Sequence, residues 1–595
     1  MINSTFSDLE SFKSMTFKQG LNIVLSEKSP DSTNLETRNR AGKTSSIELI
    51  HFCSGANADP KSLFRVPELE NYYFGIDFDL KGFRVKVSRS GHKPNEIHLI
   101  FPNRDKPNWF LDNVREDFDN NLIVTNNEWK TILGSNMFSL NTPQNEDDES
   151  ENILGPTFRS LFSYFVRRQL SGGFTTPVKQ STMQQLGDQQ TAISYLLGLD
   201  WTIPKQWAIV RAREKSLKEI KKAAKEGSFG SIIGNSAELR TRLAVAEERT
   251  SRLRETISNF QVLNEYRDFE IEASNLIRQM GILADENTID LDLIGEFGKS
   301  LNTEDAPTSD DLEELYKEVG IVLPDSVLTR FEDVRNFHDS VVKNRKSYLN
   351  GEIQSARQRI IDRDVTKSRL NTRYVTIMQL LKSHGALEQL YNFQQELSRL
   401  QAETEAIRQR LTTAEQLERE KVELDIERNQ LYLRLDQDYK EQQEGALSKA
   451  IITFERVSQS LYKDAGSLTI KPSLNGPVFD VTIHGDKSKG ITNMQIFCFD
   501  MMLMRLCIEQ KIGPGYIIHD SHLFDGVDGR QVGKALEVGA QIARENGFQY
   551  IVTLNSDILN SITEEYPEGE NLSDFILPAR LNDSQNGGLF GIRFK

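Results

Sequence analysis

Short apolar and alternating runs characterise the first 204 residues of the chain. Residues 21–25 (LNIVL) are predominantly apolar, and such a short run is typical of a buried strand. Residues 72–89 alternate between apolar and polar positions on either side of Lys81 and Gly82, which predicts a hairpin of two strands. Residues 1–204 are therefore expected to form a mixed globular region.

The last part of the chain, residues 451–595, returns to the same kind of pattern. Two apolar runs, at 516–518 and 550–554, are separated by residues 531–545, whose apolar positions have helical periodicity. Strand, helix and strand in this order are typical of a parallel sheet. The fold class predicted for the two terminal regions is therefore α/β.

The central region, about residues 205–450, contains the 3.5-residue repeat of a coiled-coil seam twice. Apolar or small residues follow alternating steps of four and three positions over residues 239–260, and again over residues 390–414. A segment rich in Asp, Glu and Pro, about residues 283–340, separates the two seams. We expect the chain to reverse in this tip segment and to form an antiparallel coiled-coil hairpin. An ordinary helical bundle is the alternative.

Composition narrows the class of protein. The 595 residues contain 72 Lys and Arg against 87 Asp and Glu, and a net charge of −15 argues against a protein that coats nucleic acid throughout. Cys53, Cys498 and Cys507 lie in apolar surroundings, which excludes a disulfide framework and fits a reducing cytoplasm. No apolar run approaches the roughly 18 residues that span a bilayer, and no signal peptide is visible. We therefore expect a cytoplasmic protein without membrane contact.

A candidate phosphate-binding loop follows the first apolar strand. Residues 37–46 (TRNRAGKTSS) are close to G-x-x-x-x-G-K-[ST], in the required setting of strand, loop and helix, although Thr37 replaces the first glycine. Gly42 lets the backbone approach phosphate oxygens, Lys43 places a charge on the β- and γ-phosphates, and the hydroxyl of Thr44 can bind Mg²⁺. The candidate nucleotide-binding residues are Arg38, Asn39, Arg40, Ala41, Gly42, Lys43, Thr44 and Ser45.

A second candidate site lies where the apolar run at 516–518 ends. Asp520 follows this run after one histidine, as a Walker B aspartate follows its strand. A carboxylate in this position can hold Mg²⁺ directly or through water. Together with the loop around Gly42, Asp520 predicts a protein that binds ATP and Mg²⁺.

The order of these features resembles the SMC, RecN and RecF group of ABC-type ATPases. The resemblance covers the architecture of the whole chain, whereas identity of motifs is confined to short stretches. It implies one ATPase head assembled from an N-terminal lobe (1–204) and a C-terminal lobe (451–595), with the hairpin (205–450) inserted between them. Residues 517–528 (IIHDSHLFDGVD) also resemble an uncharacterised C-terminal domain of bacterial ATPases in this group. Some of those ATPases belong to multi-component anti-phage defence operons.

The resemblance implies further site residues in both lobes. Gln169 ends an apolar segment similar to the Q-loop of the double-strand-break repair branch, and would contact Mg²⁺ and the attacking water. Ser488 and Gly490 occupy the place of the signature motif, which contacts the γ-phosphate held by a partner head. Residues 170–174 (LSGGF) match the signature better as a string, but they lie in the other lobe and are interpreted as a glycine turn.

Two departures from the family pattern concern hydrolysis. Ser521 stands where the family has the glutamate that acts as general base, and Asn555 stands at the switch histidine. His522 and Asp525 are nearby substitutes, since an imidazole ordinarily titrates near pH 6.5. Asp528 is similar to the D-loop aspartate at a shifted spacing. ATP binding is therefore better supported than fast hydrolysis, and we expect a slow ATPase.

The family also implies macromolecular partners. Seven basic residues at the base of the first arm could follow the phosphates of DNA, although a solvated helix face is an equal alternative; they are Arg211, Arg213, Lys215, Lys218, Lys221, Lys222 and Lys225. The leading hypothesis is an SMC-like ATPase whose heads form a homodimer around ATP. It would sense or clamp DNA in anti-phage defence or genome maintenance, beside a co-encoded effector or regulatory protein. The alternative is a regulatory scaffold that binds ATP, barely hydrolyses it and controls a separate effector.

Overall fold

The computed structural model describes residues 1–28, 42–102, 115–116, 122–141, 155–225, 235–260, 267–303, 325–381, 386–462, 465–483, 488–584 and 586–592. The chain is a mixed α/β protein with two compact units. We call Met1–Ile209, Val319–Phe331 and Arg428–Lys595 the α/β unit, and Val210–Glu318 with Glu332–Glu427 the helical unit. The expected central region, 205–450, thus begins before the helical unit and ends after it.

The α/β unit contains three sheets within its described part. A six-stranded antiparallel sheet has the order β1-β3-β4-β5-β7-β6, a four-stranded parallel sheet has the order β10-β11-β2-β12, and β8 pairs with β9. The strands are β1 (Ile2–Ser7), β2 (Gly20–Glu27), β3 (Tyr73–Leu80), β4 (Phe83–Ser90), β5 (Glu96–Ile100), β6 (Arg115–Glu116), β7 (Leu122–Thr125), β8 (Ser467–Lys471), β9 (Val478–Thr482), β10 (Tyr516–His519), β11 (Gln549–Asn555) and β12 (Leu581–Asn582).

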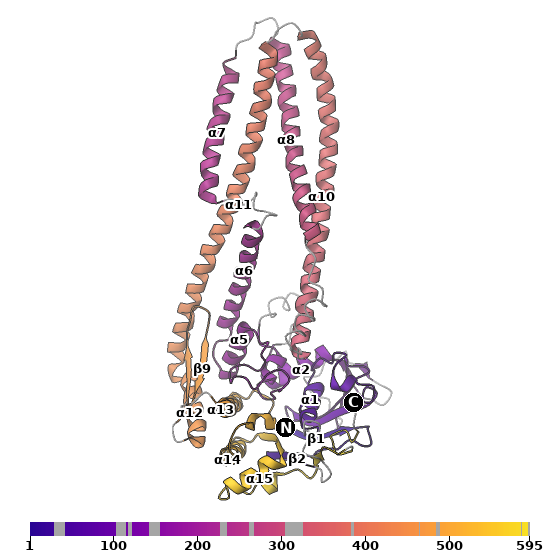
Figure 1. Ribbon diagram of the computed structural model, residues 1–595, viewed down its shortest axis with the longest axis vertical. Coiled ribbons are helices and arrows are strands. Elements are labelled where there is room, and N and C mark those ends of the chain that lie inside the picture. Colours follow the sequence, from indigo (N-terminus) through magenta and orange to yellow (C-terminus); the bar gives the residue numbers. More distant parts are fainter. Residues whose placement is uncertain are drawn as a thin grey trace. The chain divides into compact units, whose positions relative to one another are not determined.

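The β-hairpin predicted around Lys81 and Gly82 and the predicted parallel sheet are both confirmed. β3 and β4 pair up to Leu80 and Phe83, and the two residues between them, Lys81 and Gly82, both have positive φ, as a two-residue hairpin turn with right-handed strand twist requires. In the parallel sheet, β2 from the start of the chain lies directly beside β11 from its end (Figure 1). Strands β2, β10 and β11 therefore present their carboxyl ends at one edge.

Helices pack against both larger sheets. The helices of the α/β unit are α1 (Lys43–Cys53), α2 (Asn126–Phe138), α4 (Phe158–Phe162), α5 (Leu186–Leu197), α12 (Ala446–Leu461), α13 (Lys489–Glu509), α14 (Gly529–Asn546) and α15 (Ser556–Glu565). α14 and α15 contact β2 and β11 of the parallel sheet, and α1 contacts β3 and β4 of the antiparallel sheet. In α13, every residue from 496 to 504 is fully buried. α13 is also the one helix in the described part that is long and apolar enough to cross a membrane. The expectation that no apolar run reaches this length was therefore wrong. Because 72% of its apolar window is buried inside the unit, its composition is explained by packing.

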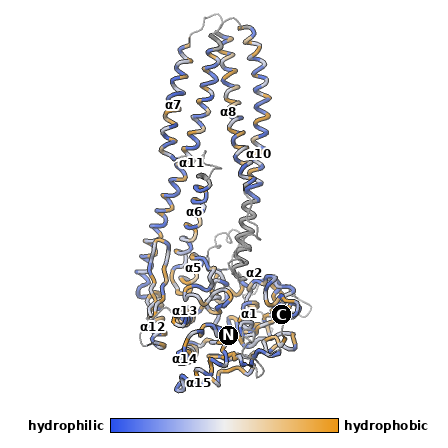
Figure 2. The backbone as a smooth tube through the Cα atoms, in the orientation of Figure 1, coloured by the Kyte–Doolittle hydropathy of each residue, from blue (hydrophilic) through white to orange (hydrophobic). Residues whose placement is uncertain are grey.

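The helical unit is built from long helices that pack side by side. Its helices, some of which extend into the α/β unit, are α6 (Thr202–Lys225), α7 (Ser236–Ser258), α8 (Arg267–Thr303), α10 (Asp325–Leu381) and α11 (Ala386–Glu441). Hydrophilic and hydrophobic residues alternate along them (Figure 2), as expected for helices that bury one face.

α7 and α11 pack in antiparallel orientation through residues of the two predicted seams. Leu239 near the start of α7 packs against Leu411 and Ala414 of α11. Further along α7, the hydroxyls of Thr250 and Thr404 are 3.2 Å apart. As residue numbers rise along α7, those of its partners on α11 fall, so the two helices run in opposite directions.

The structure differs from the sequence analysis in the predicted tip segment, about 283–340. Residues 283–303 continue α8 and residues 325–340 belong to α10, while residues 304–324 lie outside the described part. The acidic residues that suggested a break are paired across helices: Asp290 of α8 forms ion pairs with Arg359 and Arg363 of α10. Partly exposed ion pairs add little stability, but these contacts give the acidic stretch basic partners on the neighbouring helix. The described part of the helical unit therefore has five helices, α6, α7, α8, α10 and α11, where two arms were expected.

Candidate functional site

The phosphate-loop motif lies at the start of α1, directly after β2 in the parallel sheet. Gly42 immediately precedes the helix with φ of +83°, and a Cβ there would lie 2.7 Å from the backbone nitrogen of Leu589. Both facts require glycine at this position. Lys43, Thr44 and Ser45 form the first turn of α1, where backbone N–H groups have no partner inside the helix and can receive an anion. The predicted Arg38, Asn39, Arg40 and Ala41 lie outside the described residues.

Lys43 connects the start of α1 with the ends of two neighbouring strands. Its ammonium group donates a hydrogen bond to the hydroxyl of Ser521, at 3.2 Å, and another to the side-chain oxygen of Asn555. The side chain is 9% exposed. An ammonium group in this place, at the start of α1 and beside the ends of β10 and β11, is suited to bind a phosphate ligand.

Thr44 and Asp520, two of the three side chains predicted to bind Mg²⁺, are in contact; the third, Gln169, lies beside His522. The Thr44 hydroxyl donates to Oδ2 of Asp520 at 3.3 Å, and the carboxylate is 3% exposed. Oxygen ligands at about 2.0–2.1 Å from an octahedral Mg²⁺ lie about 2.9 Å apart when adjacent. The two oxygens therefore fit a shared Mg²⁺ with a small adjustment. The other carboxylate oxygen accepts from the Ser521 hydroxyl at 3.1 Å, which orients the group.

The segment that carries Gln169 runs beside β10. Val166 forms a parallel bridge with Ile518, and the N–H of Ile518 donates to the carbonyl of Phe165 at 2.8 Å. This pairing carries Gln169 past the end of β10, towards the residues that follow Asp520. There its amide nitrogen lies 3.4 Å from Nδ1 of His522.

His522 and Asp525, the proposed substitutes for the catalytic glutamate, form a close pair. Nδ1 of His522 is 2.7 Å from Oδ2 of Asp525, and the same carboxylate oxygen is 3.3 Å from Nζ of Lys489. Because Asp525 is closer to Nδ1 than Gln169 is, it is the stronger partner of this nitrogen. A carboxylate that accepts the Nδ1 hydrogen leaves Nε2 of the imidazole as a proton acceptor.

The residues assigned to the signature motif and the D-loop both begin helices. The Ser488 hydroxyl accepts from the N–H of Ile491 at 3.3 Å at the start of α13, and Asp528 accepts from the N–H of Gln531 at 2.9 Å at the start of α14. A Cβ on Gly490 would clash with the carbonyl oxygen of Gly526. Ser488 and Asp528 are therefore helix caps in this chain, and their contact with nucleotide stays a prediction.

The string LSGGF, residues 170–174, is a turn, as the sequence analysis interpreted it. Gly172 has a φ of +69°, and its N–H donates to the carbonyl of Gln169 at 2.8 Å. Next to the turn, Phe174 contacts the His522 ring edge to face, with ring centroids 5.6 Å apart. The turn therefore packs against the candidate base.

Several residues around the site were not predicted from the sequence. Thr553 of β11 accepts a hydrogen bond from the N–H of Ser521 at 3.0 Å, and Arg168 forms an ion pair with Glu48 of α1. A sequence signal for the contact of Arg168 with Glu48 was present. Arg167 and Arg168 lie side by side in an apolar segment, and buried arginines need acidic or carbonyl partners.

His51 fixes α1 against the segment before Gln169. Burial holds the pKa of His51 well below its usual value, and the charges of Arg159 and Arg168 lower it further. The neutral ring can then donate from Nε2 to the carbonyl of Val166, at 2.9 Å, and accept at Nδ1 from Arg159, at 2.8 Å. The helix that carries Lys43 and Thr44 is thereby attached to the segment that carries Gln169.

Two family models match parts of the chain. Residues 457–594 match the family described as an uncharacterised protein conserved in bacteria (DUF2326). Residues 294–418 match C-terminal domain 10 of the ABC-three component (ABC-3C) systems. The first match confirms the resemblance of the C-terminal region to an uncharacterised bacterial domain. The second confirms the resemblance to ATPases of multi-component systems.

Whole-chain relatives are distant. The uncharacterized protein YydD of Bacillus subtilis (strain 168) is 20% identical over 603 residues, which cover 97% of this chain and 96% of that protein. Two solved structures of Smc head domains with coiled coil, from Pyrococcus yayanosii and Pyrococcus furiosus, both have a TM-score of 0.33, with 13% and 11% identity. The alignments cover 94% of this chain in both cases, and 93% and 90% of the other chains. Similarities of this size do not establish a shared fold.

Proposed function

We propose that this protein is an SMC-like ATPase of a multi-component bacterial defence system. In this proposal the α/β unit binds ATP with Mg²⁺, and ATP controls the association of two heads. The observation that carries it is the meeting of Lys43 and Thr44, from the N-terminal region, with Asp520 and Asn555, from the C-terminal region, at one edge of the parallel sheet. Ligands of parallel α/β sheets bind at the carboxyl ends of the strands.

Each of these residues has a distinct part in binding. The ammonium group of Lys43 faces the β- and γ-phosphates, and the first-turn N–H groups of α1 surround the oxygens. Thr44 and Asp520, with Gln169 as the third predicted ligand, would hold Mg²⁺, which would neutralise phosphate charge. Asn555 accepts from Lys43 and so keeps the ammonium group directed to the edge of the sheet.

Hydrolysis is assigned to His522 with Asp525. The Ser521 hydroxyl already donates to Asp520, a carboxylate that the proposal assigns to Mg²⁺. Asp525 holds Nδ1 of His522 and keeps Nε2 free to take a proton from water, which is the arrangement of a base oriented by a carboxylate. Because a histidine replaces the usual glutamate, we expect turnover to be slow.

One observation supports the second candidate function, a regulatory scaffold that binds ATP and barely hydrolyses it. Both positions at which the family has its catalytic glutamate and switch histidine, here Ser521 and Asn555, accept hydrogen bonds from Lys43. Such a site can bind phosphate firmly without activating water. Binding of ATP without measurable turnover would favour the scaffold, whereas both candidates require ATP binding.

The proposal includes three partners. Two heads associate through residues 488–495, because a single head leaves the γ-phosphate open to water on one side. A co-encoded effector or regulatory protein follows from the match to a three-component system. DNA has the weakest support: Lys215 and Lys218 of α6 are exposed, but Arg213 is already paired with Glu427 at 2.9 Å.

The test is ATP binding and turnover by the purified full chain. Lys43→Ala should lower ATP affinity by about 10- to 150-fold, because a hydrogen bond to a charged group contributes about 1.5–3 kcal/mol. Lys449→Ala, which removes an exposed lysine of α12, is the matched control and should bind like the wild type. Unchanged affinity in folded Lys43→Ala, or no ATP binding by the wild type, would contradict the proposed function.

A further inference from the structure

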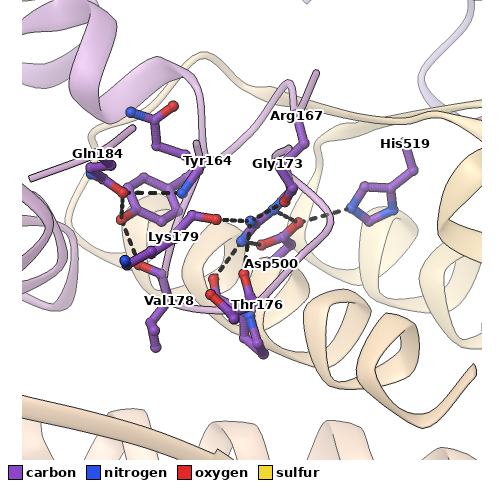
Figure 3. Close-up of polar contacts among 11 residues, drawn as sticks. Tyr164, Arg167, Gly173, Thr176, Val178, Lys179, Gln184, Asp500 and His519 are labelled. Carbon is purple, nitrogen blue, oxygen red and sulfur yellow. Dashed lines mark hydrogen bonds and ion pairs between the residues drawn. The ribbon is translucent and has the colours of Figure 1, made fainter. Parts of the chain in front are cut away.

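A fully buried ion pair lies behind the candidate site. Arg167 contacts Asp500 of α13 through two hydrogen bonds, from Nε at 2.7 Å and from Nη2 at 2.6 Å, and neither side chain has exposed surface. The remaining N–H groups of the guanidinium donate to backbone carbonyls of the following loop, those of Gly173, Pro177 and Lys179, at 2.6–2.8 Å (Figure 3). All five N–H donors of this arginine are therefore used.

Asp500 also accepts a hydrogen bond from the strand that precedes Asp520. Nε2 of His519 lies 3.3 Å from Oδ2 of Asp500, and Nδ1 of His519 lies 3.3 Å from the hydroxyl of Tyr550. Burial, together with the Asp500 charge, raises the pKa of Tyr550, so its hydroxyl remains protonated and can donate to Nδ1. With that hydrogen bond at Nδ1, the neutral ring carries its own hydrogen on Nε2 and donates to Asp500; Figure 3 shows the contact between His519 and Asp500.

These contacts form a continuous chain from Tyr550 through His519 and Asp500 to Arg167. Its members come from β11, β10, α13 and the segment before the glycine turn. His519 immediately precedes Asp520, and Arg167 is two residues before Gln169. A displacement of the buried pair would therefore move Gln169 and Asp520, two of the three predicted Mg²⁺ ligands, relative to each other.

We propose that Arg167 and Asp500 are positioning residues for the nucleotide site. They hold the segment of Gln169 and the strand end of Asp520 at a fixed separation on α13. This inference rests on the function proposed above. A buried ion pair is weak evidence for added stability, but it fixes geometry strictly, because a change in either partner leaves a buried charge unpaired. Neither residue contacts the nucleotide site directly; both act through their neighbours in the chain.

The test compares Arg167→Lys and Asp500→Asn with a matched control. Arg89 is also fully buried and donates to backbone carbonyls, those of Phe52 and Ala56, but it lies in β4 of the antiparallel sheet. We expect Arg167→Lys to lower kcat by about 10²-fold, the size of effect that a small misplacement of reacting groups produces. Affinity for ATP without Mg²⁺ should stay close to the wild-type value, because Lys43 and α1 are unchanged.

A second readout reports the loop itself. Arg167 holds the carbonyl of Lys179, so trypsin should cleave after Lys179 faster in Arg167→Lys than in the wild type or in Arg89→Lys. If Arg167→Lys and Asp500→Asn do not fold, Tyr550→Phe continues the test. It removes only the hydroxyl that orients His519, and should lower kcat with ATP affinity retained.

The outcomes separate this inference from the proposed function. A wild-type chain that does not bind ATP overturns both. If the wild type binds ATP without turnover, the readout becomes the gain in ATP affinity on addition of Mg²⁺, which Arg167→Lys should lose. Wild-type kcat or Mg²⁺ gain in folded Arg167→Lys overturns the positioning role alone. The positioning role is also overturned if Arg89→Lys, with the same thermal midpoint as Arg167→Lys, loses as much kcat or Mg²⁺ gain.

Discussion

Two glycines of the α/β unit have nearly the same backbone conformation in very different surroundings. Gly42, before α1, has a φ of +83°, and Gly82, in the β3–β4 turn, has a φ of +85°. A Cβ on Gly82 would meet nothing within 4 Å, whereas a Cβ on Gly42 would lie 2.7 Å from the nitrogen and 3.0 Å from the Cβ of Leu589. Substituting each by alanine therefore separates the cost of the backbone conformation from the cost of the contact.

The expected magnitudes follow from these contacts. A residue with a side chain in the left-handed region costs about 1–2 kcal/mol, which is the whole effect expected for Gly82→Ala. For Gly42→Ala the clash adds about 1–3 kcal/mol, the usual cost of overpacking. The clash is with backbone and Cβ atoms of a residue that is 1% exposed, so no rotation of a flexible side chain can relieve it.

The assay measures ATP affinity and the thermal midpoint of both variants. If the start of α1 moves to relieve the contact, its N–H groups move with it. A cost of about 1–3 kcal/mol then weakens ATP binding by about 5- to 150-fold. Gly82→Ala should lower the midpoint slightly and leave ATP affinity unchanged, because its turn belongs to the other sheet.

Two results would refute this reasoning. If Gly42→Ala and Gly82→Ala lose the same stability and both bind ATP normally, the contact with Leu589 does not constrain the phosphate loop. If Gly42→Ala loses more stability yet binds ATP normally, the segment of Leu589 moves instead of α1. In both cases the close packing of Gly42 would have no role in nucleotide binding.

Three further predictions concern turnover, association and pH. His522→Ala and Asp525→Asn should each lower steady-state turnover by about 10²-fold with ATP affinity kept, as expected for loss of a general base or its orienting group; full turnover in both would place the base elsewhere. Light scattering should show the mass of a dimer when ATP and Mg²⁺ are added, and substitution within residues 488–495 should prevent it; a strict monomer at saturating ATP, with no constitutive dimer, would exclude this interface. Burial raises the pKa of Asp285 in α8 from 3.8 to about 6, so the folded state binds its proton more tightly and loses stability as pH rises through that interval. Asp285→Asn should therefore give a small rise in the thermal midpoint at pH values above 6 and no rise at pH values below 4. Asp292→Asn, at an exposed position of the same helix, should give no such rise at either pH. Equal effects of the two variants would contradict the assignment.

The parts of the site that could be predicted are those with a local signature. Lys43 and Thr44 follow a strand and open a helix, and Asp520 and Asn555 follow apolar runs. Since parallel strands place their carboxyl ends at one edge, recognising the strands was enough to bring these residues together. The contacts of Lys43 with Asn555 and of Thr44 with Asp520 are the result.

The helical unit was harder to predict because its pairing is not local. Taken alone, a run of acidic residues suggests that a helix ends there. The same run can be helical when basic residues of a neighbouring helix lie opposite it. Asp290 and Arg359 are 69 positions apart, so the sequence near Asp290 contains no sign of its partner. The 3.5-residue seams were visible because they depend only on spacing within one helix.

Asp500 shows how far local reasoning can go for the interior of the protein. It lies within the apolar run of α13, and a carboxylate there must have a cationic or hydrogen-bonding partner, because burial of an isolated charge is too costly. The sequence alone therefore requires a partner for Asp500 and, by the same reasoning, for Arg167 in its own apolar segment. It cannot pair them, since they are 333 positions apart and other buried arginines, such as Arg89, compete for the assignment. Two such charges in two apolar segments, Arg167 shortly before Gln169 and Asp500 in the helix that precedes the strand of Asp520, are nevertheless a signal that these segments meet in the core. The same signal can be sought in other chains whose site is divided between their two ends.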